Sequence, residues 1–186
     1  MLDPELLGPE RVRRIKRSEY DRLVEAGSFE DERVELLHGA IVSMSPNHPE
    51  HAGPITRLTK LLVRAVGDRA DVRIQLPYWA SDESEPEPDI AVVPPGPWDR
   101  EHPARAHLVI EVAVSSLSKD RQLKAPLYAA SGVTEYWIVN VAERCVEVFR
   151  GPDGRRFSSA TRHGCEEAIA LVAFSDVVVR GRDVIG

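Results

Sequence analysis

Hydrophobic residues recur at helical spacing in three parts of the chain. The first two are residues 10–27 and 55–66, and each stops at or just before a glycine, the residue that most often ends a helix. The third is residues 118–131, which begins at Ser118, a residue type that caps helix N-termini. The pattern therefore predicts three amphipathic helices.

Shorter apolar runs between these segments predict strands. Residues 33–45 are expected to form two short strands around a turn at His38–Gly39, and residues 71–80 alternate between apolar and polar side chains. Residues 88–94 and 106–114 are almost continuously apolar, which is typical of strands covered on both faces. Further strands are expected at 135–140, in a hairpin that turns at Pro152–Gly154, and at a sheet edge formed by 168–179.

The order of these elements predicts an α/β (α+β) fold. The helix between the strands at 106–114 and 135–140 calls for a right-handed crossover, so we expect a mixed central β-sheet flanked by helices, with extra β-hairpins at the C-terminus. A length of 186 residues favours one domain. We divide residues 1–186 into an N-terminal helical extension (1–31), a core (32–141) and a β-rich C-terminal extension (142–186).

Composition and charge narrow the classes of protein to consider. No apolar stretch approaches the ~20 residues of a membrane span, and the N-terminus lacks the apolar core of a signal peptide, so we expect a cytoplasmic protein that does not enter a membrane. Cys145 and Cys165 show no CxxC spacing and are expected to be buried thiols. The net charge of −6 argues against binding nucleic acid through bulk electrostatics and leaves room only for a local basic groove.

Two carboxylates stand at the apolar strands. Glu111 lies inside "LVIEVAV", where a carboxylate is costly unless it is paired, protonated or bound to a metal ion. Asp89 opens "PDIAVV", and if the two strands are neighbours the two carboxylates converge at one end of the sheet. A divalent cation would offset their repulsion, and hard oxygen ligands suit Mg²⁺.

The following helix adds further polar residues to this set. Lys124 has Asp120 and Tyr128 on the same face, four residues before and after it. Asp, Glu and Lys beside a metal ion are suited to activate water against a phosphodiester. Asp89 alone is equally consistent with a strand-end cap, and Lys124 alone with a solvated lysine.

Several blocks of the sequence together resemble one protein family. "PDIAVV", "VIEVAVSSL" and "KDRQLKAPLYAASGVTEYWIV" are similar to the Uma-type family of restriction-endonuclease-like bacterial proteins, which belongs to the PD-(D/E)XK nuclease superfamily. The upstream "ERVELLHGAIVSMSPNHPEHAGPITRL" and "RIQLPYWASDESEPEPDIAVV" extend the resemblance over residues 32–141. The resemblance implies a restriction-endonuclease-like core.

The resemblance also implies roles for individual residues. It makes Asp89 and Glu111 metal ligands, with the backbone carbonyl of Val112 as an additional ligand. The common pattern places a lysine two residues after the glutamate, where this chain has Ala113, and Lys124 of the next helix fits that role instead.

Three more positions follow from the same resemblance. Glu35 matches an acidic position and is expected either to complete the metal shell or to be a surface strand residue. His51 and Gln75 match polar positions near the expected site, where each is a supporting residue or simply a loop histidine and a backbone partner.

These observations predict a Mg²⁺- or Mn²⁺-dependent nuclease that cuts DNA with an activated water, with Asp89, Glu111 and Lys124 as catalytic residues. The alternative is a catalytically silent or repurposed module that kept the fold for binding nucleic acid or protein. A phosphodiesterase acting on RNA or small nucleotides would use the same chemistry. A homodimer is expected because C₂ symmetry suits cutting two strands, with the apolar C-terminal segment as its interface.

Three further features of the sequence bear on whether the protein contacts nucleic acid. The acidic string at 82–87 reads as a solvated loop that would repel phosphates. The basic run at 11–17 either contacts a nucleic-acid backbone or is an exposed helix face. Trp79 and Trp98 either stack on bases or pack within the protein.

Overall fold

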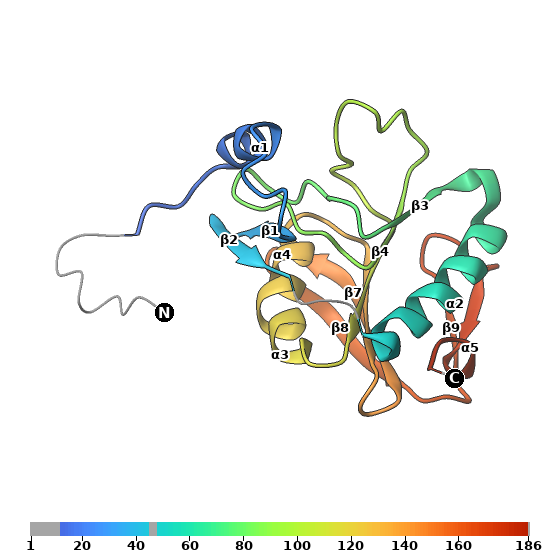
Figure 1. Ribbon diagram of the computed structural model, residues 1–186. Coiled ribbons are helices and arrows are strands. Elements are labelled where there is room, and N and C mark those ends of the chain that lie inside the picture. The colour runs from blue at the N-terminus through green and yellow to red at the C-terminus, as the bar shows by residue number, and fades with distance from the viewer. Residues whose placement is uncertain (1–11, 45–47, 186) are drawn as a thin grey trace.

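A six-stranded mixed sheet forms the centre of the molecule in the computed structural model, which describes residues 12–44 and 48–185 (Figure 1). The strand order is β3-β4-β5-β6-β7-β8, and all neighbours are antiparallel except the parallel pair β5–β6. The strands are β3 (Asp71–Ile74), β4 (Ile90–Val93), β5 (Leu108–Ala113), β6 (Glu135–Asn140), β7 (Cys145–Asp153) and β8 (Arg156–His163).

Helices cover both faces of this sheet, as Figure 1 shows. The long helix α2 packs on one face, and the helical segment that connects β5 to β6 packs on the other. This connection consists of three consecutive helical pieces, of which the middle one, η3, is a π-helix. The helices are α1 (Arg17–Glu25), α2 (Pro49–Val66), the 3₁₀ turn η2 (Gly67–Arg69), α3 (Leu117–Lys119), η3 (Asp120–Lys124), α4 (Ala125–Ala130) and α5 (Gly181–Ile185).

Two small hairpins flank the central sheet. β1 (Val34–Leu37) and β2 (Ala40–Ser43) form one. A bridge between Leu36 and Glu85 joins β1 to the loop between β3 and β4. β9 (Ala168–Ala170) and β10 (Val178–Arg180) form the other. The apolar side chains of this second hairpin and its loop pack into the core on the α2 side of the sheet.

Side-chain alternation along β5 decides which face each residue serves. Ile110 and Val112 pack with α2 residues, whereas Val109 and Ala113 pack with α4 residues. Glu111 lies between Ile110 and Val112 in sequence and therefore belongs to the α4 face. The Glu111 carboxylate therefore lies on the face of the sheet that is covered by the helical connection carrying Lys124.

The structure confirms the expected fold class and most of the expected elements, and it corrects several boundaries. Within the described residues, the helix predicted over 10–27 begins only at Arg17: the backbone of Lys16 is extended, and the Ile15 amide donates to the Gly39 carbonyl. Residues 1–11 of the expected helical extension lie outside the described residues. The strand predicted over 71–80 ends at Ile74, because Gln75 has a left-handed backbone with φ of 50°.

The C-terminal segment also differs from expectation. Its strands do not extend an edge of the central sheet but pair with each other. Ile169, Leu171 and Val179 are buried in the core, so these apolar side chains are already covered within one chain. Val172 and Val178 of the same segment are about half exposed, and both the homodimer and an interface formed by this segment stay predictions.

The remaining general expectations have mixed outcomes. Cys145 is buried, as expected, but Cys165 is partly exposed, and both are free thiols. Within residues 12–44 and 48–185, no helix is both long and apolar enough to cross a membrane.

Candidate active site

A cavity of about 310 Å³ lies where the ends of β3, β4 and β5 meet the start of α2 and the α3–η3 segment. Nine residues singled out from the sequence concern this region; seven of them line the cavity, and the other two, Glu35 and Tyr128, contact lining residues through their side chains. The charged and polar side chains that line it are His48, His51, Gln75, Glu87, Asp89, Glu111, Ser115, Ser116, Lys119, Asp120 and Lys124.

Asp89 and Glu111 face the cavity from neighbouring strands. Ile90 pairs with Ile110 in the antiparallel register of β4 and β5, so Asp89, one residue before β4, comes opposite Glu111. Both side chains are on the α4 face of the sheet and both residues are buried. The prediction that these two carboxylates converge is therefore confirmed by the strand pairing.

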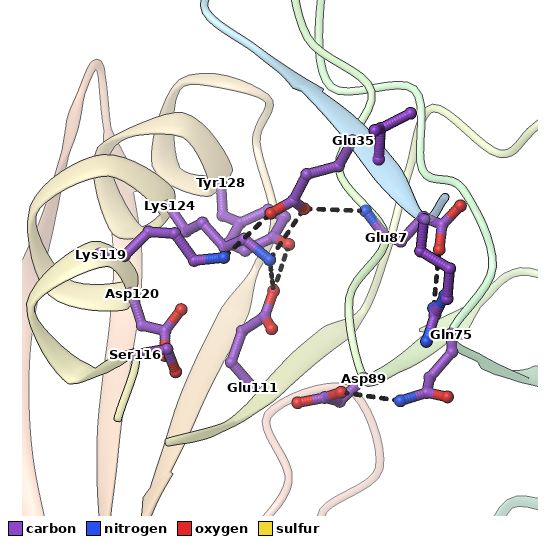
Figure 2. Close-up of polar contacts among 12 residues, drawn as sticks. Glu35, Gln75, Glu87, Asp89, Glu111, Ser116, Lys119, Asp120, Lys124 and Tyr128 are labelled. Atoms are coloured by element: carbon purple, nitrogen blue, oxygen red, sulfur yellow. Dashed lines mark hydrogen bonds and ion pairs between the residues drawn. The ribbon is translucent and has the colours of Figure 1, made fainter. Parts of the chain in front are cut away.

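Asp89 is held in place by three donors from three different elements. Its Oδ2 accepts a hydrogen bond from the Val112 amide at 2.8 Å and lies 3.0 Å from Nε2 of His51. Its Oδ1 accepts from the Gln75 carboxamide at 3.3 Å (Figure 2). The backbone of Gln75 also donates to the Asp89 carbonyl at 3.2 Å. The left-handed turn at Gln75 therefore brings both its amide groups to Asp89.

Glu111 accepts two hydrogen bonds through a single oxygen. Lys124 Nζ lies 2.9 Å from its Oε1, and the Tyr128 hydroxyl donates to the same oxygen at 2.7 Å (Figure 2). Burial raises the pKa of Glu111 to about 8, and the charges of Asp120 and Asp89 act in the same direction against the opposing effect of Lys124. The carboxylate thus sits in surroundings rich in negative charge.

Glu35 is a fully buried carboxylate whose two oxygens both contact a lysine. Its Oε1 accepts from Lys119 Nζ at 3.1 Å, and its Oε2 lies 3.0 Å from Lys124 Nζ. The backbone amide of Glu87 also donates to Oε2, at 3.3 Å. Burial would raise the pKa of Glu35, but the two lysine charges outweigh it, and the pKa is lowered. The interpretation of Glu35 as a surface strand residue is therefore wrong.

Lys124 joins the two carboxylates from above the sheet. It lies in η3, and its ammonium contacts both Glu111 and Glu35 (Figure 2). Burial acts to lower the pKa of Lys124, but Glu111 and Glu35 outweigh it and the pKa is raised. The interpretation of Lys124 as an exposed, solvated lysine is therefore wrong.

Asp120 and Tyr128 follow Lys124 into the same layer. Asp120 is buried and lines the cavity, and its side chain accepts a hydrogen bond from the Ser116 hydroxyl at 2.5 Å. Burial raises the pKa of Asp120, against the Ser116 hydrogen bond. Tyr128 reaches Glu111 directly, as described above, and burial raises its pKa well above the ordinary value.

The acidic string and the basic run, considered separately in the sequence, form ion pairs with each other. Arg14 lies 3.5 Å from Glu83, and Arg17 lies 3.6 Å from Glu85. Glu85 is buried rather than solvated, and burial raises its pKa to about 7. Because arginines from the N-terminal segment pair with these carboxylates, the loop repels phosphates less than its sequence indicated.

Both tryptophans have partners within the protein. The Arg17 guanidinium lies over the Trp79 ring at 4.1 Å, and the Trp98 indole donates to Asp71 at 2.9 Å. These contacts favour packing over base stacking at both positions.

Lys119 and Glu87 belong to the site but were not expected there. Lys119 stands next to Asp120 in "SKDRQLK" and has no feature in the sequence that separates it from a solvated lysine. Only the structure shows that Glu35 is buried and therefore needs cationic partners, so the sequence held no signal for Lys119. Glu87 belonged to the string read as solvated, yet it lines the cavity.

Val112 lines the cavity as well, and its amide serves Asp89. Whether its carbonyl binds a metal ion stays a prediction. Across residues 12–44 and 48–185, no three His, Cys, Asp or Glu side chains are grouped closely enough to hold a metal ion by themselves. Of the side chains that the resemblance made metal ligands, Asp89 and Glu111 face the cavity.

Comparisons with known proteins agree with this architecture. Residues 17–177 match the Uma2 family, described as "Putative restriction endonuclease". A crystal structure described as "a putative nuclease belonging to DUF820", from Anabaena variabilis ATCC 29413, matches with a TM-score of 0.74 and 17% sequence identity over 92% of this chain and 97% of that one. No curated protein matches the chain. Since the family match spans most of the sequence, including every residue of the cavity described above, the chain belongs to the Uma2 family of restriction-endonuclease-like proteins.

Proposed function

We propose that the protein is a nuclease that hydrolyses DNA phosphodiester bonds with the help of Mg²⁺ or Mn²⁺. One observation carries the proposal: two buried carboxylates from neighbouring strands meet at a cavity beside a buried lysine. Membership of a family described as restriction endonucleases supports the same reaction class. DNA is proposed as the substrate because the family description refers to restriction endonucleases.

The donor set fits a hard divalent cation. Asp89 and Glu111 offer carboxylate oxygens, which Mg²⁺ and Mn²⁺ prefer, and both line the cavity. The pKa of Glu111 is raised by burial and by neighbouring carboxylates, a repulsion that a cation at this position would offset. When bound there, the metal would act as a Lewis acid that lowers the pKa of the attacking water.

Neighbouring residues fix the orientation of the Asp89 and Glu111 carboxylates. The Val112 amide and the Gln75 carboxamide fix the direction of the Asp89 carboxylate. Lys124 and Tyr128 do the same for Glu111. Lys124 also contributes a fixed positive charge next to the position of the scissile phosphate, where negative charge develops in the transition state.

Glu35 is better suited to hold lysines than to bind the metal ion. Both of its oxygens contact ammonium groups, and one of them also accepts the Glu87 amide. A ligand role would require at least one of these contacts to break inside a buried environment. We therefore assign the metal to Asp89 and Glu111, and Glu35 to the positioning of Lys119 and Lys124.

A catalytically silent binding module is the second candidate. It is favoured by the Lys124–Glu111 ion pair, because a lysine that already satisfies Glu111 would also be stable in a protein that binds no metal. Calorimetric titration separates the two candidates. A nuclease should bind Mn²⁺, and binding should be lost in Asp89→Asn, whereas the silent module should give no heat of binding in either protein.

Plasmid cleavage tests the proposed reaction itself. Purified protein with Mn²⁺ should nick supercoiled DNA, and Glu111→Gln, which removes the charge but keeps the side-chain volume, should reduce the rate by at least about a hundredfold. Asp71→Asn serves as a control, because Asp71 is a carboxylate on β3 that binds the Gly96 amide and the Trp98 indole outside the cavity. Equal cleavage by the parent and Glu111→Gln would show the assignment to be wrong.

A further inference from the structure

Two lysines share one buried carboxylate, yet their surroundings differ. Lys119 and Lys124 lie 3.1 Å and 3.0 Å from the two oxygens of Glu35. The Lys124 side chain is 2% exposed, whereas that of Lys119 is 31% exposed. Both line the cavity, so their difference lies in how freely each ammonium can change partners.

Lys124 is held in its present position by two buried ion pairs. Its ammonium contacts Glu35 and Glu111 at once, and both of these residues are buried. Moving it towards a substrate would leave two carboxylates without their cation in a water-poor layer, which is strongly unfavourable. Lys124 therefore acts on a substrate through its electric field and not through direct contact.

Lys119 can change partners at a much smaller cost. Its described hydrogen bond is the one to Oε1 of Glu35, and its partly exposed side chain borders the cavity. If it leaves, Glu35 keeps Lys124 and the Glu87 amide on its other oxygen. Because Lys119 is partly exposed, an entering anion can replace Glu35 as its partner, and this exchange costs less than moving the buried Lys124 away from two carboxylates.

The negative charges that line the cavity make a mobile lysine useful for binding an entering phosphate. Glu87, Asp89, Glu111 and Asp120 all line it, and they oppose the entry of a phosphate unless a cation meets it. Lys119 is the cavity lysine whose departure still leaves its carboxylate partner, Glu35, paired with a second lysine. Its long, flexible side chain lets the ammonium follow a phosphate oxygen.

We infer that Lys119 binds a phosphate group of the nucleic-acid substrate directly, releasing Glu35 as the substrate enters. The inference rests on the proposed nuclease function and adds to it the residue that receives the substrate. In this arrangement Glu35 is a shared counter-ion: it holds Lys124 permanently and Lys119 only in the absence of substrate.

DNA binding without cleavage provides the test. Affinity for a short fluorescent DNA duplex is measured with Mn²⁺ in the Glu111→Gln background, at several salt concentrations. Adding Lys119→Ala should weaken binding about tenfold at low salt and reduce the slope of log affinity against log salt by about 0.9, the value for one phosphate contact. Lys119→Arg should keep the affinity within about twofold, because a guanidinium can contact both a carboxylate and a phosphate.

Two controls separate substrate contact from a structural role. Arg155→Ala removes one positive charge from the exposed turn between β7 and β8 and should leave the salt dependence unchanged. The thermal midpoint of each variant is recorded in parallel. A role limited to supporting Glu35 would lower the midpoint of Lys119→Ala while leaving the salt slope unchanged, and this result would overturn the inference.

The remaining outcomes distinguish this inference from the proposed function. If the Glu111→Gln protein binds DNA and Lys119→Ala binds it equally well with the same slope, the phosphate contact is wrong and the nuclease assignment stands. If the parent and Glu111→Gln neither bind nor cleave DNA, both are wrong. Cleavage kinetics give an independent reading, since Lys119→Ala should raise KM more than it lowers kcat.

Discussion

Lys124 Nζ lies 2.9 Å from Oε1 of Glu111, and both residues are buried between β5 and the helical connection that follows it. Neither group would be stable there as an isolated charge, since transfer from water into a protein interior is costly. The pair is completed by Glu35, so that one cation serves two carboxylates. Lys124 therefore contributes both to the stability of this buried layer and to the chemistry of the site.

Replacing Lys124 by methionine should lower the free energy of unfolding by about 3 kcal/mol, because it leaves two buried carboxylates without their shared cation. Lys119→Met is the matched comparison, since Lys119 contacts the same Glu35 from a partly exposed position. Its cost should stay within about 1 kcal/mol. Urea unfolding of the three proteins measures both effects. Equal losses of unfolding free energy in the two variants would contradict the view that Lys124 is held more strongly than Lys119.

A second substitution should recover part of the stability lost in Lys124→Met. Glu35→Gln removes one of the two buried negative charges that lose Lys124, of which Glu35 keeps only the partly exposed Lys119, so the double variant should be more stable than Lys124→Met alone by about 1 kcal/mol or more. In the parent background the same Glu35→Gln change should be destabilising, because Lys124 then loses a partner. A change of the same sign in both backgrounds would show that Glu35 and Lys124 are not coupled.

The Tyr128 hydroxyl should also contribute measurably to stability. It donates to Glu111 at 2.7 Å from a fully buried position, so Tyr128→Phe should cost about 1.5 kcal/mol. Tyr78 is a buried tyrosine whose hydroxyl makes only long contacts of 3.3 and 3.4 Å, and Tyr78→Phe should cost less than about 1 kcal/mol. Thermal unfolding ranks the two, and the opposite order would rule out a strong Tyr128–Glu111 hydrogen bond.

The convergence of Asp89 and Glu111 could be predicted because it follows from strand order. Apolar runs identify β4 and β5, and a carboxylate inside such a run is costly enough to indicate a function. Neighbouring strands then bring the two residues together. Lys124 was identified from its place on the next helix, with Asp120 and Tyr128 on the same face, and from the family resemblance, which assigns the missing lysine to that helix.

The partnership of Glu35 with two lysines could not be predicted in this way. Glu35 and Lys119 are joined by a contact between elements far apart in sequence, and no local pattern specifies how the β1–β2 hairpin docks on the α3–η3 segment. The π-helical turn over Asp120–Lys124 was equally hidden, since its residues follow an ordinary helical pattern. The pairing of Arg17 with the acidic loop is a third case, because it depends on where the N-terminal segment packs.

Glu85 should make stability depend on pH. Its pKa is raised from 4.5 to about 7 by burial and by the charge of Asp21, with Arg17 opposing and Glu87 adding to the rise. The folded protein therefore retains a proton between these two values that the unfolded chain has released. Stability should consequently fall as pH rises through this window, by up to about 3 kcal/mol for this group.

Comparison with Glu85→Gln isolates this effect from other titrating groups. The variant carries no charge at position 85, so its free energy of unfolding should fall less than that of the parent between about pH 5 and pH 8. Urea unfolding with EDTA at several pH values gives both profiles. Glu83→Gln, which alters an exposed neighbour, should follow the parent. Parallel profiles for the parent and Glu85→Gln would mean that Glu85 titrates near its ordinary value.

Metal binding should be visible as a gain in stability even without DNA. A ligand that binds only the folded protein adds about 2.7 kcal/mol at a hundred times its dissociation constant, so Mn²⁺ should raise the thermal midpoint of the parent and EDTA should reverse the rise. Asp89→Asn should lose this response, since it removes one charged ligand while an amide oxygen can still accept from Val112. Asp71→Asn should respond like the parent, because Asp71 binds its partners outside the cavity. If Mn²⁺ raised the thermal midpoint of all three proteins equally, the metal would bind elsewhere, and its stabilising effect would not involve the carboxylates of Asp89 and Glu111.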